Sequence, residues 1–331
     1  MMHRLTLIVL TGLAVNLTGC LYYGHYGTRS GPESALSIDP DYFRLDRLTP
    51  TVPQVLSTRN RGGYTVQKLK FTSHTAFLYL PKEGTDFKSV PSQSKSVPRR
   101  PAVIILPITQ GDYYTKQMAN YLVREGFIAL RYQSHGHLVT AKNSTDALTV
   151  FETLLKNDVL DVLEGLDWLG TRPFVDRERI GIVGVSMGAV IGSVVAGVDT
   201  RIRAGVFILS GGNLSGILLT SSEPSIVSIR KRIEEEEDLA PDELTAEVAR
   251  RLRNVDPLTH AARLDPSRVL MINAYFDHVI RRRYGNALWK AAGEPPLIML
   301  PTGHYSAALF FPYAERRMLA HFRKVFGLEK K

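Results

Sequence analysis

The chain has 331 residues, of which 44% are hydrophobic and 22% are charged, and its formal net charge at pH 7 is +9. This hydrophobic content is enough for a sizeable core and excludes an intrinsically disordered chain. The basic residues are scattered and no nucleic-acid-binding motif accompanies them, so the charge does not predict a nucleic-acid partner. It indicates either a mild bias toward anionic membrane surfaces or a solvated basic surface without a partner.

The N-terminus has the pattern of an export signal. A short basic start, residues 1–4, precedes an apolar run over residues 5–17 that only Thr, Gly and Asn interrupt. The run is too short and too interrupted to span a bilayer, but it fits the apolar region of a signal peptide. It ends in Leu17-Thr18-Gly19-Cys20, which resembles a bacterial lipobox. We therefore expect a signal peptide over residues 1–19.

Cys20 is the only cysteine, so it has no disulfide partner within the chain and cannot belong to a thiolate metal cluster. The lipobox resemblance implies that its sulfur carries lipid and that the mature protein begins there. The protein would then be exported and anchored to the cell envelope, on the periplasmic face of the outer membrane in a Gram-negative source. The alternative is an incidental cysteine after an uncleaved apolar terminus.

The body of the chain follows a linker. Residues 20–63 are rich in Tyr, Gly, Ser, Pro and Arg without sustained periodicity, which indicates a tether. Two alternating runs, 64–71 and 75–80, then predict a β-hairpin, and residues 81–101 predict a surface loop. Buried strands and helices alternate afterwards: strands at 102–107, 127–132, 179–185, 204–209, 269–274 and 297–300, and helices at 113–125, 146–169, 186–196 and 306–325.

This alternation predicts one α/β domain over residues 64–327, with a mostly parallel, doubly wound sheet and an N-terminal antiparallel hairpin. One block, residues 213–264, falls outside it. Apolar residues at helical spacing predict a helical cap insertion there, with a second helix that begins near Pro241 and ends near Arg253. Those apolar residues would either line an apolar pocket or pack the helices onto the core, and we favour packing.

A candidate nucleophile lies where one buried strand meets a helix. The segment Gly184-Val185-Ser186-Met187-Gly188 follows an Ile- and Val-rich run, and small residues continue at helical spacing. This pattern predicts a strand, a sharp turn and a helix, with glycines where a side chain would clash with neighbouring backbone and Ser186 exposed at the turn. The pentapeptide also arises by chance as an ordinary Gly-rich turn. Whether Ser186 is a nucleophile therefore depends on whether the rest of the chain supplies a base and an acid.

A serine hydroxyl needs a base within hydrogen-bond reach and a third group that orients the base. Asp277 follows the predicted strand 269–274, and His304 follows the strand 297–300. Sites of open α/β sheets form at the carboxyl ends of strands, where both residues lie. Alternatively, Asp277 caps a helix and His304 is a polar residue of a turn. His278 is a weaker candidate base because it is adjacent to the acid.

With these residues the sequence resembles the α/β-hydrolase superfamily over 64–326, particularly its esterase, dienelactone-hydrolase-like and acyl-peptidase-like branches. The resemblance implies that Ser186 is the nucleophile, His304 the base and Asp277 the orienting acid, and that no cofactor is needed. It also implies an oxyanion hole that uses the backbone N–H of Met187 and one from Ile108 or Thr109. Residues 107–112 depart from the His-Gly-rich segment of many relatives.

These features predict a membrane-anchored serine esterase that acts on a small-molecule ester or acyl substrate. The alternatives are a peptidase or amidase of the same fold, or a catalytically silent, membrane-tethered binding protein. His135 and His137 have no third ligand with suitable spacing nearby, so we assign no metal site. Acyl-chain preference, protein partners and oligomeric state stay open at this stage.

Overall fold

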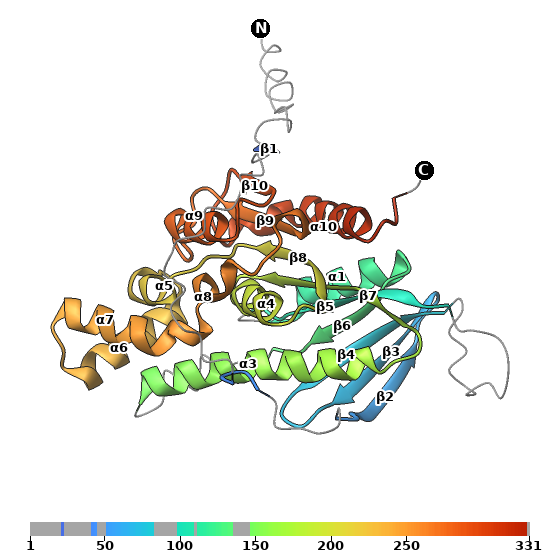
Figure 1. Ribbon diagram of the computed structural model, residues 1–331, viewed down its shortest axis with the longest axis horizontal. Helices are drawn as coiled ribbons and strands as arrows, with labels where there is room; N and C mark the ends of the chain where they lie inside the picture. Colours follow the sequence, from blue (N-terminus) through green and yellow to red (C-terminus); the bar gives the residue numbers. More distant parts are fainter. Residues whose placement is uncertain are drawn as a thin grey trace, which may run out of the picture.

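The computed structural model describes residues 21–22, 41–44, 51–82, 98–108, 111–134 and 146–329. They form one 10-stranded sheet in the order β1-β10-β9-β8-β7-β5-β6-β4-β3-β2 (Figure 1). Its centre is parallel, and β4 pairs antiparallel with β6. The central strands are β5 (Arg100–Ile105), β6 (Ile128–Tyr132), β7 (Val175–Val185), β8 (Ile202–Ile208), β9 (Val269–Ala274) and β10 (Leu297–Leu300).

Helices cover both faces of the sheet, which confirms the predicted doubly wound α/β class. One core cluster packs the sheet against α3 (Ala147–Gly170), α4 (Met187–Val198) and α9 (Arg282–Ala291). The other packs it against α1 (Tyr113–Arg124) and α10 (Phe311–Val325). Successive residues of a central strand point to opposite clusters, so such strands are buried on both faces and consist of apolar residues without alternation.

The predicted N-terminal hairpin is confirmed as β3 (Tyr64–Lys70) and β4 (Thr75–Pro81). The tether prediction over residues 20–63 is wrong at β2 (Gln54–Asn60), which pairs with β3. All residues of β2 are exposed, so the strand buries no face that would leave an apolar alternation in the sequence. A short strand, β1 (Leu21–Tyr22), closes the opposite edge by pairing with β10.

Two helical features differ from the expected elements. The helix α9 was not predicted, and the final helix is divided into η3 (Ser306–Phe310) and α10. Proline lacks an N–H and fits the first turn of a helix, so Pro312 favours a new helical start at this point. The shorter element, η3, begins two residues after His304.

The predicted helical insertion, residues 213–264, contains α5 (Leu214–Thr220), α6 (Pro224–Glu237), α7 (Pro241–Leu252), η1 (Arg253–Val255) and α8 (Pro257–Ala261), and η2 (Pro266–Arg268) follows it. Asp256 joins its two ends, because its side chain accepts hydrogen bonds from the N–H groups of Asn213 at 3.0 Å, Leu214 at 2.5 Å and Leu258 at 2.8 Å. The insertion is thereby held against the end of β8.

Several predictions lie outside the described residues. They are the signal peptide over residues 1–19, the lipidation site Cys20, most of the tether, and His135 and His137. None of the described helices combines the length and the apolar content that crossing a membrane requires.

Candidate active site

The segment around Ser186 is a sharp turn between β7 and α4. Ser186 has φ 55° and ψ −121°, a conformation that L residues rarely adopt. A Cβ on Gly184 would lie 2.1 Å from the carbonyl oxygen of Gly188, and a Cβ on Gly188 would lie 2.4 Å from that of Pro107. Both glycines are therefore required by close backbone contacts, as the sequence indicated, and the turn holds the Ser186 side chain at the end of the strand.

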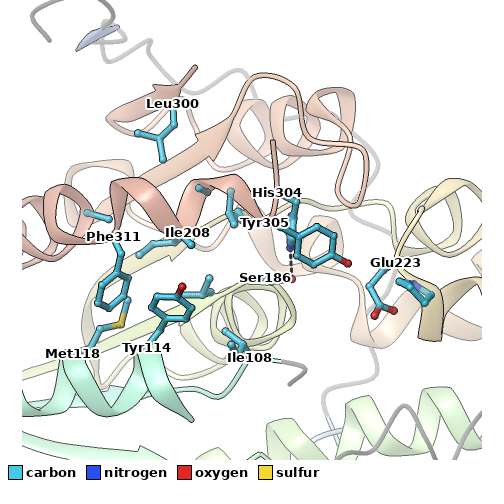
Figure 2. A pocket seen from close by; sticks show the side chains of 16 residues that line it. Ile108, Tyr114, Met118, Ser186, Ile208, Glu223, Leu300, His304, Tyr305 and Phe311 are labelled. Carbon is cyan, nitrogen blue, oxygen red and sulfur yellow. Dashed lines mark hydrogen bonds between the residues drawn. The ribbon is translucent and has the colours of Figure 1, made fainter. Parts of the chain in front are cut away.

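The structure brings Ser186, His304 and Asp277 together in one hydrogen-bonded series (Figure 2 shows the first pair). His304 Nε2 lies 2.9 Å from Ser186 Oγ, and His304 Nδ1 lies 2.7 Å from Asp277 Oδ2. The side chains of His304 and Asp277 are 9% and 2% exposed, so little solvent competes for these bonds. This is the geometry in which a histidine can take the serine proton while a carboxylate orients the ring.

The loops that hold the acid and the histidine are fastened to each other. The N–H groups of Tyr275 and Phe276 donate to the carbonyl oxygens of Leu300 and Thr302, each at 2.9 Å. These bonds continue the parallel pairing of β9 with β10 beyond the strand ends. They explain why residues 27 positions apart in sequence meet at one edge of the sheet. His278 is exposed, and His304 makes the bond to Ser186.

Backbone donors lie beside Ser186. Met187 is the first residue of α4, where an N–H has no partner within the helix and the helix dipole favours negative charge. The loop after β5 lies against this turn through the contact of Gly188 with Pro107, and Ile108 lines the same cavity as Ser186. Thr109, the other predicted donor, lies outside the described residues.

A cavity of about 390 Å³ begins at Ser186 and His304 and extends between α1 and α10 (Figure 2). Most of its wall is apolar. It is lined by side chains from the loop after β5, from both helices and from the sheet edge, among them Ile108, Tyr114, Met118, Ile208, Phe311 and Ala314. This volume is in the range that binds small molecules, and the apolar wall favours an apolar ligand portion.

A second cavity of about 30 Å³ lies on the insertion side of Ser186. Its wall combines α3 and α4 with the insertion helices α5 and α6 and is also mostly apolar. Glu223 lines both cavities and accepts a hydrogen bond from the Ile226 N–H at 2.8 Å, which caps α6. The insertion thus forms one wall of the site, and its predicted apolar residues Ile229, Ile233, Leu244, Val248 and Leu252 are buried in the core.

Sequence reasoning missed the residues that shape these cavities. Met118 and Ala314 have the spacing of ordinary core positions on their helices, and no sequence signal separates a cavity wall from a packed core. Tyr305 is adjacent to His304 and mostly exposed. Partial desolvation and the neighbouring Glu223 and Asp277 carboxylates raise the pKa of this phenol, and Tyr305 lines the larger cavity beside His304.

Comparison with known proteins gives two family matches. Residues 87–220 match the dienelactone hydrolase family, and residues 163–326 match the family described as BAAT / acyl-CoA thioester hydrolase C terminal. The comparison with curated proteins found no match.

Solved structures share the architecture at low identity. Acetyl xylan esterase 1 from Thermoanaerobacterium sp. JW/SL YS485 is 18% identical with a TM-score of 0.60, covering 88% of this chain and 96% of its own. The acetyl xylan esterase from Paenibacillus sp. R4 is 14% identical with a TM-score of 0.60, covering 82% and 89%. The Pyrococcus horikoshii acylaminoacyl peptidase is 16% identical with a TM-score of 0.52, covering 84% and 42%. At these identities the likeness shows a common fold.

Proposed function

We propose that this chain, which has the α/β-hydrolase fold, is a serine hydrolase that cleaves carboxylic esters through an acyl-enzyme intermediate. The observation that carries this proposal is the hydrogen-bonded series from Ser186 through His304 to Asp277 at the mouth of an apolar cavity. The structural likeness to two acetyl xylan esterases supports an ester as the substrate.

The geometry supports a two-step reaction. His304 Nε2 takes the proton of Ser186 Oγ as that oxygen attacks the ester carbonyl, and Asp277 holds the imidazole in the tautomer that allows this transfer. The Met187 N–H and one N–H of the Ile108–Thr109 loop stabilise the oxyanion. The tetrahedral intermediate then collapses, His304 returns the proton to the leaving alcohol, and water hydrolyses the acyl-enzyme by the same steps.

The cavity between α1 and α10 favours an ester whose acyl half is an apolar chain of medium length. An acetyl group has one methyl beyond its carbonyl carbon and would leave most of the 390 Å³ without contacts. A longer chain would exclude water from these apolar walls. The match to a family described by acyl-CoA thioester hydrolysis supports the assignment of the apolar alkyl chain to the acyl half of the substrate rather than to its alcohol half.

The proposed location of the enzyme is the cell envelope, to which lipid on Cys20 would anchor it after export. The support is the sequence alone: the basic start, the apolar run and the tetrapeptide that ends at Cys20. More than one acyl chain makes such anchoring durable.

The deciding experiment compares the wild-type protein with Ser186→Ala. A fluorophosphonate probe should label the wild type and not the variant, and the variant should lose roughly a thousandfold or more in kcat/KM for an ester. The substitution removes the hydrogen bond between Ser186 and His304 and leaves the packing of the core in place. We therefore expect the midpoint temperature of thermal unfolding to change little. Retained ester hydrolysis in the variant would refute the assignment, and absence of labelling in folded wild type would favour a catalytically silent binding protein.

A further inference from the structure

A second group of titratable side chains lies away from the cavities at Ser186. His74 is in the turn between β3 and β4, and Asp161 and Glu164 lie one helical turn apart on the face of α3 that the turn contacts. His74 and Glu164 are buried, and the Asp161 side chain is 14% exposed. None of these residues lines either cavity at Ser186. The reaction proposed above does not use them.

The His74 imidazole is fully buried without a hydrogen bond. Its exposed fraction is 0%, and neither Nδ1 nor Nε2 has a hydrogen-bond partner. The ring lies between Phe71 and Tyr132, with centroid separations of 4.6 and 4.9 Å and nearly parallel planes. These stacks fix the plane of the ring and direct Nδ1 toward the carboxylates. A buried polar group without a hydrogen bond is costly, so the arrangement indicates an occupant that Nδ1 can bind together with the carboxylates.

The distances between the three side chains fit metal ligation. His74 Nδ1 lies 3.3 Å from Asp161 Oδ1 and 3.7 Å from Glu164 Oε2, and the three candidate ligand atoms lie within 4.8 Å of one another. Nitrogen and oxygen ligands that are each about 2.0–2.2 Å from one Zn²⁺ ion lie about 3 to 4 Å apart. The distances from Nδ1 to the two carboxylate oxygens are therefore within the range expected between ligands of one Zn²⁺ ion.

Neighbouring hydroxyl groups hold the carboxylates in place. Thr72 Oγ1 donates to Glu164 Oε1 at 2.8 Å, and Ser73 Oγ donates to Asp161. Such bonds orient carboxylate ligands toward a metal. Two carboxylates and a neutral imidazole carry a charge of −2, which a divalent cation balances. Because the Asp161 side chain is partly exposed, a metal has a path of entry and water has access to a remaining coordination position.

We propose that His74, Asp161 and Glu164 bind one divalent transition-metal ion of the Zn²⁺ class, which fastens the β3–β4 hairpin to α3. An imidazole nitrogen with two carboxylates favours Zn²⁺ over Mg²⁺, which prefers an all-oxygen octahedral shell. The competing explanation is an imidazolium paired with two carboxylates, and it requires no metal. This proposal is independent of the proposed ester hydrolysis.

The test is titration of the full-length, chelator-treated protein with ZnCl₂ at pH 7.5, followed by calorimetry, with MgCl₂ in parallel. We expect one Zn²⁺ per chain and no binding of Mg²⁺ at the same concentration. Zinc at a hundredfold excess over its Kd should raise the thermal midpoint by roughly 5 °C. Asp161→Asn and Glu164→Gln should each weaken zinc binding by about tenfold or more and reduce that rise. Asp158→Asn, on the preceding turn of α3, is the matched control and should bind as the wild type does.

Wild-type protein that shows no saturable zinc binding would overturn the proposal and leave the imidazolium pair as the explanation. Binding with one-to-one stoichiometry that survives in the Asp161→Asn, Glu164→Gln double variant would also overturn it, because the ion would then lie elsewhere. The wild-type titration decides the question even where a variant fails to fold.

Discussion

Asp277 uses its two carboxylate oxygens for different purposes. Oδ1 accepts the N–H groups of Val279 and Ile280, each at 2.8 Å, and Oδ2 accepts from His304 Nδ1 at 2.7 Å. The first pair of bonds fixes the carboxylate to its own loop, so the His304 ring is oriented by an immobile acceptor. Positioning of this kind is worth more to a reaction than attraction between mobile charges.

Asp277→Asn separates the two purposes. The amide oxygen can still accept from Val279 and Ile280, so we expect the thermal midpoint to change little. The amide NH₂ would face His304 Nδ1 and favour the tautomer that carries its proton on Nε2, where the Ser186 proton must go. We expect kcat for an ester to fall by about ten thousandfold.

Steady-state kinetics and thermal unfolding measure the two effects. Asp265→Asn is the matched control, since Asp265 also accepts a backbone N–H, that of Ser267 at 2.9 Å, away from the site. An unchanged rate in Asp277→Asn would mean that another acid orients His304.

The candidate triad could be predicted because each member follows a strand whose apolar run marks its end. The second oxyanion donor could not be assigned to one residue, since every residue except proline has a backbone N–H and side-chain identity gives no signal. The cluster of His74, Asp161 and Glu164 could not be predicted either. The two carboxylates are about ninety positions from His74 in sequence, and only the packing of the hairpin on α3 brings the three side chains together.

At the scale of elements, the larger cavity lies at the division of the last helix, and residues of both parts line it. η3 follows His304, and α10 then starts afresh at Phe311. Phe311 faces Tyr114 and Met118 of α1 across the cavity (Figure 2), and Ala314 of the same helix also lines it. The sequence predicted one uninterrupted helix over residues 306–325, and that prediction gave no sign of a cavity beside it.

Ala314→Phe should abolish the rise of kcat/KM with acyl-chain length. For the wild type, each methylene that enters the cavity contributes about 0.8 kcal/mol, so kcat/KM should rise about fourfold per methylene from acetyl upward until the cavity is filled. A phenyl ring at position 314 would occupy part of that space. We expect the rise to disappear while acetyl-ester turnover remains close to wild type.

The measurement is kcat/KM over p-nitrophenyl esters of increasing acyl length, for wild type and variant. Ala320→Phe, at an exposed position of the same helix, is the control and should keep the wild-type series. A second series that varies the alcohol tests the assignment of the cavity to the acyl half. If neither series rises in the wild type, the proposed chain specificity is wrong, although ester hydrolysis by Ser186 would stand.

At the scale of the whole molecule, the alternation of strands and helices made the sheet predictable, since short connections and buried parallel strands leave few other topologies. The two edge strands of the sheet were less predictable. β2 is exposed on both faces, and β1 pairs only two residues, Leu21 and Tyr22, with β10. The exposed residues of β2 leave no apolar alternation in the sequence, and two residues are too few to show a period for β1.

Two modes of attachment would hold the protein at a membrane. Cys20 directly precedes β1 in the sequence, and a lipid on it would attach the protein by insertion of apolar chains into the bilayer. The net charge of +9 offers a second, electrostatic mode of attachment to anionic lipid. The two modes differ in their response to salt, because at 1 M salt the Debye length is only about 3 Å.

Cys20→Ala should therefore transfer the protein from the membrane fraction to the soluble fraction or block its maturation. Wild-type protein should stay with membranes in 1 M salt and leave them in detergent, because hydrophobic anchoring is not screened by salt. Fractionation followed by immunoblotting measures both, and kcat/KM of the released variant for a soluble ester should equal that of the wild type, since Cys20 precedes the hydrolase domain. Attachment that persists in Cys20→Ala but is lost in 1 M salt would show that basic surface residues, and not lipid, hold the protein at the membrane.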